Sequence, residues 1–184
     1  MIQKRFILIE HFCRGEVLHL GGGEPERGIS LNNLLKEKHK VWSVDIQRGA
    51  DYVRDLNAKD WKIKRTFDTV LAPEIIEHVG NPISFIRNCA RLTKKGGICV
   101  VSTPNASSLI YLYNPRWCVT DPYLGLVHIH AFTKPMIEEI MKAGGFKIVY
   151  SSYLNEFLYN PFGRLICHIF PRLRGDIFIV GRKL

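Results

Sequence analysis

Two short stretches decide the fold of this chain: Val17-Leu18-His19-Leu20-Gly21-Gly22-Gly23 and Val41-Trp42-Ser43-Val44-Asp45. Each is an apolar run of strand length, and the interval between them is long enough for one helix. The first run stops at clustered glycines, whereas the second stops at a carboxylate. An α/β sheet builds a nucleoside pocket from this order of strand, glycine turn, helix and acid-tipped strand.

The residue types at these positions suit an adenosine ligand. Glycine lacks a Cβ, so a turn of Gly21 to Gly23 lets a ligand come within hydrogen-bonding distance of the backbone. The helix that follows directs its free N–H groups at the same place. Asp45 ends the neighbouring strand and offers two acceptor oxygens to a ribose diol. The sequence therefore predicts where a nucleoside cofactor binds.

The glycines do not form a dinucleotide fingerprint. Counting from Gly21, the sixth position of Gly-x-Gly-x-x-Gly holds Glu26, so the third glycine is missing. The carboxylate of Glu26 would also stand near the place of a pyrophosphate and repel it. A dinucleotide cofactor is therefore disfavoured.

Strand and helix patterns alternate along the rest of the chain. After the first strand, further strands are expected at 41–46, 51–56, 67–72, 98–102, 146–153 and 176–181. Helices are expected at 3–14, after Ser30, after Asn81-Pro82 and at 133–142. This alternation predicts an α/β fold in which helices cover both faces of a mostly parallel sheet.

The helix after Asn81-Pro82 has clear start and stop signals. Asparagine caps a helix, proline suits its first position, and glycine preceded by basic residues ends it, as in Lys94-Lys95-Gly96. The stripe that this helix is expected to bury consists of Ile83, Ile86 and Ala90.

Two later segments lack a regular pattern. Residues 103–131 hold three prolines, and we expect an irregular acceptor lid or loop there. Residues 154–175 mix aromatic and basic residues with prolines. A covered crossover between the closing strands is the preferred interpretation of this second segment, and a membrane-touching or acceptor-binding patch is the alternative.

Several segments resemble class I S-adenosylmethionine-dependent methyltransferases that act on small molecules and lipids. They are Phe67-Asp68-Thr69-Val70, Ile76-Glu77-His78-Val79-Gly80-Asn81-Pro82, Arg91-Leu92-Thr93-Lys94-Lys95-Gly96-Gly97, Ser102-Thr103-Pro104-Asn105, His130-Ala131-Phe132-Thr133 and Ala143-Gly144-Gly145-Phe146. The resemblance to these methyltransferases extends from about residue 15 to the C-terminus. The order and spacing of these motifs are more specific than any one of them.

The resemblance implies a Rossmann-like, doubly wound fold with a mostly parallel seven-stranded sheet and helices on both faces. It also implies S-adenosylmethionine as cofactor and S-adenosylhomocysteine as product. The implied cofactor-binding residues are Gly21, Gly22 and Gly23 below the methionine moiety, Asp45 at the ribose with Ile46 beside it, Asp55 and Leu56 at the adenine, and Ala72 and Pro73 flanking the methionine portion. In the plainer alternative, the glycines only form a turn and Asp55 is a cap or a surface acid.

The chain departs from the family's first motif, which reads acidic-x-Gly-x-Gly-x-Gly. Gly21 and Gly23 match it, whereas Pro25 takes the place of the third glycine. His19 stands where the family usually has an acid that helps to hold the cofactor's ammonium. A neutral imidazole does this poorly and an imidazolium opposes it. A second hypothesis therefore stays open, a non-catalytic relative that serves as a partner-binding or regulatory subunit.

Methyl transfer from a sulfonium is an in-line displacement, so the protein contributes mainly by excluding water and holding the acceptor close. If the acceptor is a hydroxyl, a general base helps to remove its proton. The resemblance places the candidates Glu77, His78, His128 and His130 near the cofactor's mouth. Alternatively, Glu77 and His78 brace the next helix and the other two pack in a loop. His128-x-His130 offers no obvious third ligand, so the sequence predicts no metal site.

Composition limits the class of protein. With 184 residues, 46% of them hydrophobic and 23% charged, the chain is expected to form one soluble globular domain, 1–184, with a lead-in helix at 1–14. Its five cysteines form no Cys-x-x-Cys pair, which favours a reducing cytoplasm. No segment has the pattern of a signal peptide or of a bilayer span.

The net charge of +9 favours anionic partners, but the basic residues are scattered in short clusters. A nucleic-acid partner is therefore disfavoured, and Ala72-Pro73-Glu74 does not resemble an amine-methylating Asn-Pro-Pro-Tyr motif. The sequence predicts methylation of a small molecule, lipid intermediate or glycan at oxygen, with peripheral membrane contact left open. It does not identify the acceptor or the oligomeric state.

Overall fold

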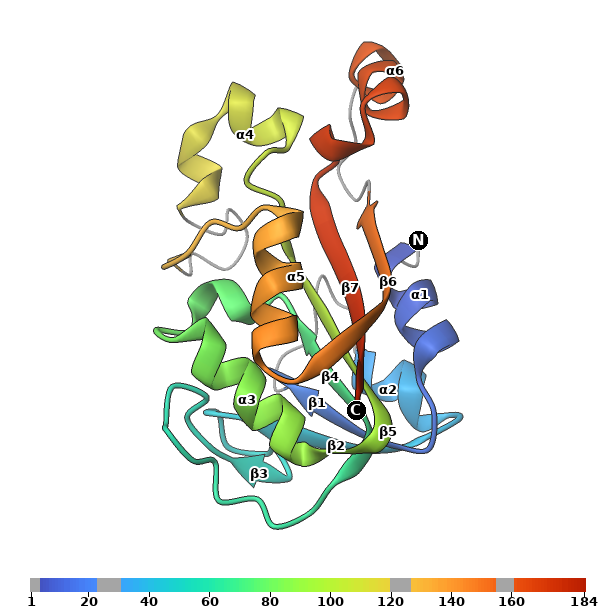
Figure 1. The fold of residues 1–184 in the computed structure, drawn as a ribbon, viewed down its shortest axis with the longest axis vertical. Coiled ribbons are helices and arrows are strands. Elements are labelled where there is room, and N and C mark those ends of the chain that lie inside the picture. The colour runs from blue at the N-terminus through green and yellow to red at the C-terminus, as the bar shows by residue number, and fades with distance from the viewer. Residues whose placement is uncertain (1–3, 23–30, 120–126, 155–160) are drawn as a thin grey trace.

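The computed structural model describes residues 4–22, 31–119, 127–154 and 161–184 (Figure 1). Within these residues, seven strands form one sheet in the order β3-β2-β1-β4-β5-β7-β6. The strands are β1 Glu16–Leu20, β2 Lys40–Asp45, β3 Tyr52–Val53, β4 Phe67–Pro73, β5 Thr93–Pro104, β6 Phe146–Leu154 and β7 Asp176–Lys183. Only β7 is antiparallel to its neighbours, β5 and β6. The predicted doubly wound, mostly parallel α/β sheet is therefore confirmed.

The described residues form the helices α1 Lys4–Phe12, α2 Leu31–Lys36, α3 Pro82–Leu92, α4 Leu109–Tyr113, α5 Lys134–Ala143 and α6 Pro161–Ile169. Helices α1 and α2 cover one face of the sheet and α3 and α5 the other, as the alternating pattern predicted (Figure 1). Three 3-10 turns, η1 Ile76–His78, η2 Pro115–Cys118 and η3 Pro171–Leu173, complete the described elements. Among the described residues, none of the helices combines the length and the apolar character needed to cross a bilayer.

Successive side chains of the central strands point to opposite faces of the sheet, so the core has two layers. Val17 of β1, Leu71 of β4 and Phe178 of β7 pack against α1 and α2, together with buried Phe6, Ile9 and Leu35. Their chain neighbours Leu18, Ala72 and Ile179 face the opposite layer, where α3 and α5 bury Phe85, Ile86, Ile137 and Met141. Because both faces are covered, the central strands are continuous apolar runs.

The strand order changes direction between β1 and β4. From β1 the chain proceeds outward through β2 and β3 on one side, and β4 begins the other half of the sheet on the other side. In open α/β sheets, ligands bind outside the carboxyl ends of the strands at such a switch point. This topology places the ends of β1, β2 and β4 together.

The buried face of α3 differs from the predicted stripe. Asn81 caps the helix as expected, because its side chain accepts from Ser84 N at 2.9 Å. The buried side chains, however, are Phe85, Ile86, Asn88, Cys89 and Leu92, and Ile83 is exposed. The Phe85 ring packs against buried Trp61 from a distant loop, with ring centroids 5.4 Å apart. That tertiary contact decides between two stripes that both have helical spacing.

The predicted helix stop at Lys94-Lys95-Gly96 was wrong. The helix ends at Leu92, and β5 begins at Thr93, which pairs with Phe67. The next pair in the register is Thr69 with Ile98, so the basic residues form an irregularity within the strand. Lys94 contacts Asp68 at 2.9 Å there instead of the end of the helix.

The third strand and the two irregular segments also need correction. β3 covers only Tyr52–Val53 of the predicted 51–56. Within 103–131, β5 continues to Pro104 and α4 and η2 follow, while 120–126 lie outside the described residues. The expected crossover at 154–175 contains α6, which lies beyond the ends of β6 and β7 in Figure 1. Phe162 and Leu165 of α6 are exposed, so this segment is not fully covered.

Candidate functional site

The glycine turn lies at the end of β1, next to β2 and to the segment after β4. Gly21 N donates to the Val44 carbonyl at 2.8 Å, which fixes the turn beside the end of β2. The φ of Gly21 is +73°, and a Cβ at this position would overlap Cδ1 of Ile75. Only glycine therefore suits this position. Gly22 is partly buried, and the predicted contribution of Gly23 lies outside the described residues.

His19 braces the glycine turn. Its side chain is buried, and Nδ1 donates to Oδ1 of Asn32 at 2.7 Å. Asn32 Nδ2 in turn donates to the Gly22 carbonyl at 2.6 Å. Burial lowers the pKa of His19 below its ordinary value, so the imidazole is neutral near pH 7. The structure thus gives the unusual residue of the first motif a role in holding the turn.

This buried imidazole makes stability depend on pH. The unfolded chain binds a proton at His19 below about pH 6.5, whereas the folded protein does so only at lower pH. The contribution of neutral His19 to the free energy of unfolding is therefore fully present above pH 6.5. It is lost as the pH falls, by at most about 1.4 kcal/mol per pH unit. Urea unfolding should show that the free energy of unfolding decreases less between pH 7 and pH 5 for His19→Asn than for the wild type. Equal losses would contradict this role.

Asp45 ends β2 beside the glycine turn, as predicted. Leu20 pairs with Val44, and Asp45 comes directly after Val44. Its Oδ1 accepts from Gln47 N at 2.9 Å, which orients the carboxylate within the loop. Ile46 is 71% exposed, an apolar side chain on the surface next to that carboxylate.

A second acid stabilises the loop after β2. Asp51 Oδ2 accepts from Ser43 N at 2.7 Å and from Ser43 Oγ at 2.8 Å. The loop that carries Asp45 and Ile46 is therefore closed at its base by side-chain hydrogen bonds. Sequence reasoning gave Asp51 no role.

The predicted adenine-side residues lie in the loop after β3. Asp55 is exposed, and its Oδ1 accepts from Asn57 N at 2.8 Å. The Leu56 carbonyl accepts from Trp61 Nε1 at 3.2 Å. Asn57 Oδ1 accepts from Gly80 N at 2.8 Å, which joins this loop to the segment after β4. The Asp55 carboxylate thus closes a turn in the loop that follows β3.

The end of β4 carries a strained residue that sequence reasoning did not assign. Ala72 and Pro73 are buried, and Glu74 follows with φ at +50°. A non-glycine residue in this region is uncommon and marks a position that its surroundings constrain. Glu74 Oε1 accepts from Ser102 Oγ at 2.8 Å and pairs with the guanidinium of Arg5 at 2.6 Å. Helix α1 is thus joined to the end of β4, which no local sequence signal indicates.

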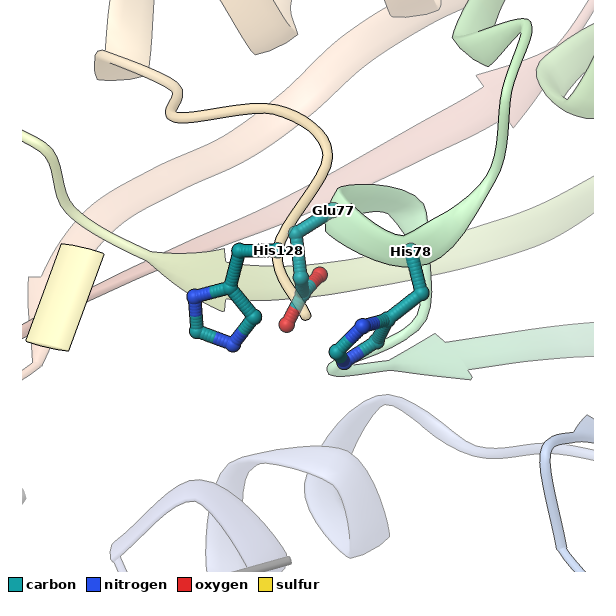
Figure 2. A group of neighbouring side chains, drawn as sticks. All are labelled: Glu77, His78 and His128. Atoms are coloured by element: carbon teal, nitrogen blue, oxygen red, sulfur yellow. The ribbon is translucent and has the colours of Figure 1, made fainter. Parts of the chain in front are cut away.

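Three of the four predicted general-base candidates lie together in the structure. Figure 2 shows the carboxylate of Glu77 between the imidazole rings of His78 and His128. One ligand atom from each residue lies within 4.8 Å of the others. The His78 and His128 ring centroids are 5.0 Å apart. We call Glu77, His78 and His128 the EHH group.

Backbone hydrogen bonds hold the EHH group in place. The Glu77 carbonyl accepts from Ile129 N at 2.9 Å and from His130 N at 3.1 Å. His78 Nδ1 donates to the Val127 carbonyl at 3.0 Å. The η1 turn and the segment at 127–130 are therefore joined at both Glu77 and His78. In neutral His78, this leaves Nε2 as the acceptor nitrogen.

The Glu77 carboxyl is buried, with 1% of the residue exposed. Its Oε2 accepts from Thr103 Oγ1 at 2.9 Å, and its Oε1 has no hydrogen-bond partner among the described residues. Burial raises the pKa of Glu77 well above its usual range, and the charge of Glu74 raises it further. Such a group holds a proton or requires a positive charge beside it.

His130 does not belong to the EHH group. Its Nε2 is buried without a hydrogen-bond partner among the described residues, and its ring packs on Phe132 with centroids 5.5 Å apart. The sequence paired His128 with His130, whereas the fold brings His128 to Glu77 and His78. Glu77 and His78 belong to η1, far from His128 in the sequence, so only the fold brings these three side chains together.

Comparisons with known proteins bear on the family and the fold of this chain. A family model described as a methyltransferase domain matches residues 5–151. The ubiquinone biosynthesis O-methyltransferase of Dechloromonas aromatica is 49% identical over 106 residues, which are 55% of this chain and 45% of that protein. The enzyme of the same name from Nitrosomonas europaea is 32% identical over 110 residues, 58% and 47% respectively. The chain thus spans less than half the length of these two relatives.

A solved structure extends the likeness to the whole fold. The crystal structure of an S-adenosylmethionine-dependent methyltransferase from Clostridium acetobutylicum matches 100% of this chain and 92% of its own, with a TM-score of 0.65. The two sequences are 13% identical, so this likeness concerns the fold alone.

Proposed function

This chain belongs to the methyltransferase domain family, and we propose that it binds S-adenosylmethionine and transfers the methyl group to a hydroxyl oxygen of a small-molecule acceptor. The observation that carries the proposal is the hydrogen bond from Gly21 N to the Val44 carbonyl. It sets the glycine turn beside Asp45 at the switch point of the sheet.

The adenosine half would bind at the ends of β2 and β3. The Asp45 carboxylate would accept from the ribose hydroxyls, while the exposed Ile46 side chain packs on one face of the adenine. Asp55 and Leu56 would meet the other side of the base, with the Asp55 carboxylate accepting from its exocyclic amine. These loops are connected, because Arg54 N donates to the Asp45 carbonyl at 2.8 Å.

The methionine half would lie over Gly21 and Gly22 and beside the end of β4 at Ala72 and Pro73. The close approach of Ile75 to Gly21 supplies an apolar wall at this point. His19 is neutral and engaged with Asn32, so it contributes no negative charge toward an ammonium. Affinity at this end would therefore depend on the backbone of the turn more than on a carboxylate at residue 19.

The reaction itself needs an oriented acceptor and a place for one proton. An oxygen lone pair forms the new bond to the methyl carbon while the S–CH3 bond breaks and its electron pair goes to sulfur. The products are a methyl ether and S-adenosylhomocysteine. The EHH group, with His130 adjoining it, lies after the end of β4 and would activate the hydroxyl. With no cation present, Nε2 of His78 would accept the hydroxyl proton.

Three observations support the acceptor class. The two relatives described above are named as O-methyltransferases, and the EHH group offers a base that would help oxygen methylation. The acceptor segment at 103–131 contains the short helix α4, with exposed Leu112 and Tyr113, which would line an acceptor site as a lid. A lipid intermediate or a glycan would present the same hydroxyl chemistry, so candidate acceptors of all three classes belong in one screen.

Calorimetry tests the proposal against its main alternative, a non-catalytic subunit of the same fold. Titration with S-adenosylmethionine and with S-adenosylhomocysteine should give binding heats at one site, and protein whose fold is verified by circular dichroism serves as the reference. A screen with methyl-deuterated cofactor then detects labelled product by mass spectrometry. No heat with either nucleoside would support the partner-binding subunit and overturn the enzymatic proposal.

A further inference from the structure

We propose that the EHH group of Glu77, His78 and His128 is a binding site for a first-row divalent cation of the zinc or manganese type. The three residues come from η1 and from the segment at 127–130, and the fold alone brings them together. One carboxylate and two imidazoles form a recognised set of metal ligands with positions left open for water or substrate.

The side chains converge in the way that a bound ion requires. Their three ligand atoms lie within 4.8 Å of one another, and Figure 2 shows the two rings on either side of the carboxylate. Ligand atoms around one such ion are separated by roughly 3–4 Å, since each bond is about 2.0–2.2 Å long. Small rotations of the side chains close the difference.

The unsatisfied carboxylate oxygen is an independent sign of a ligand. Glu77 is 1% exposed, and its Oε1 has no partner among the described residues, although Oε2 accepts from Thr103. Burying a polar oxygen without a partner is costly, and native proteins rarely leave one in that state. A cation in the EHH group would satisfy this oxygen.

The surroundings orient the ligands. His78 Nδ1 donates to the Val127 carbonyl at 3.0 Å, so Nε2 carries the lone pair that a metal takes. Metal-binding histidines commonly have their second nitrogen fixed by a carbonyl in this manner. The bonds from Ile129 N and His130 N to the Glu77 carbonyl fix the second segment against the first, so the site is largely formed before binding.

The donor set indicates which cations bind. Imidazole nitrogens suit Zn²⁺, Co²⁺ and Mn²⁺, whereas Mg²⁺ and Ca²⁺ prefer oxygen ligands throughout. We therefore expect Zn²⁺ to bind more tightly than Mn²⁺ and Mg²⁺ to bind weakest.

The chemical consequence rests on the proposed function, although the binding does not. An acceptor hydroxyl that coordinates an open position of the ion would lose its proton to solvent more readily, because a bound cation lowers the pKa of an attached hydroxyl or water. The resulting oxyanion would then attack the methyl carbon. The EHH group would in that case activate the acceptor through the ion, and His78 would act as a ligand instead of a base.

Equilibrium dialysis of the tag-free chain against Zn²⁺ and Mn²⁺, with the bound metal measured by mass spectrometry, tests the site. One equivalent of Zn²⁺ per chain is expected. Glu77→Gln and His128→Gln should each weaken its binding at least tenfold. His168→Gln removes an exposed histidine on α6 and is the matched control, for which the affinity should not change. Thermal unfolding without metal verifies that each variant is folded.

Two further measurements distinguish a failure of metal binding from a failure of cofactor binding. Visible absorption of the Co²⁺-loaded wild type should show the intense bands of a nitrogen- and oxygen-ligated ion, and this does not depend on any variant folding. Calorimetry with S-adenosylmethionine in EDTA tests cofactor binding without the cation. Zn²⁺ binding that is unaffected by both EHH variants, or a Co²⁺ spectrum identical to that of the aqueous ion, would overturn the metal site whether or not the cofactor binds.

Discussion

Replacing Trp61 with alanine is expected to lower the free energy of unfolding by about 3–5 kcal/mol, because a large buried side chain leaves a cavity that the core fills only partly. Trp61 is fully buried although it lies in the loop between β3 and β4. Its ring packs on Phe85 of α3 at a centroid distance of 5.4 Å. Urea unfolding measures the change, and the melting temperature should fall by roughly 2–4 °C per kcal/mol.

The same substitution should also weaken cofactor binding, since Trp61 positions the loop that we propose to contact the adenine. Trp61 Nε1 donates to the Leu56 carbonyl at 3.2 Å, and Arg54 Nε donates to the Trp61 carbonyl at 3.0 Å. Trp61→Phe is the control, because it keeps most of the apolar contact and removes only the bond to Leu56. A stability loss below about 1 kcal/mol for Trp61→Ala would mean that the loop packs differently.

Replacing Asp45 with alanine is expected to weaken S-adenosylmethionine binding by about 1–3 kcal/mol, or roughly 5- to 150-fold in Kd. The proposed contact is a charge-assisted pair of hydrogen bonds to the ribose, and alanine removes both acceptors. Isothermal titration with cofactor and with S-adenosylhomocysteine measures the effect. The loss should be similar for the two ligands, since they share the ribose.

Two variants control for this effect. Asp45→Asn keeps one acceptor oxygen and should lose less affinity than the alanine variant. Asp60→Ala removes an exposed acid paired with Arg91 at 2.8 Å and should leave the affinity unchanged. Unaltered binding by Asp45→Ala in folded protein would contradict the placement of the ribose.

Local signals in the sequence predicted most of the architecture. The apolar runs predicted β1 and β2, and the alternation of strands with helices predicted a mostly parallel sheet with both faces covered. Asn81 and Pro82 predicted the start of α3 because capping depends on neighbours along the chain. The same local rules failed at the end of α3, where pairing of Thr93 with Phe67 outweighs the helix-stop signal of Gly96.

The candidate site was only partly predictable. Asp45 and the glycine turn were found because a strand followed by a glycine turn and a second strand ending in an acid is a pattern along the chain. His19 was recognised as unusual, yet its role depends on Asn32, 13 residues away. Arg5 and Glu74 were missed because their ion pair joins α1 to the end of β4 across the fold.

The sequence by itself determined the succession of the seven strands and of helices α1, α2, α3 and α5, the position of the glycine turn and the acid at residue 45. These features depend on periodicity and on the conformational freedom of single residues. The tertiary structure alone decided which side chains meet. His128 lies beside Glu77 and His78 because the 127–130 segment donates two backbone hydrogen bonds to the Glu77 carbonyl. Such contacts between distant segments follow from packing and hydrogen bonding of the whole chain, and spacing along the sequence does not record them.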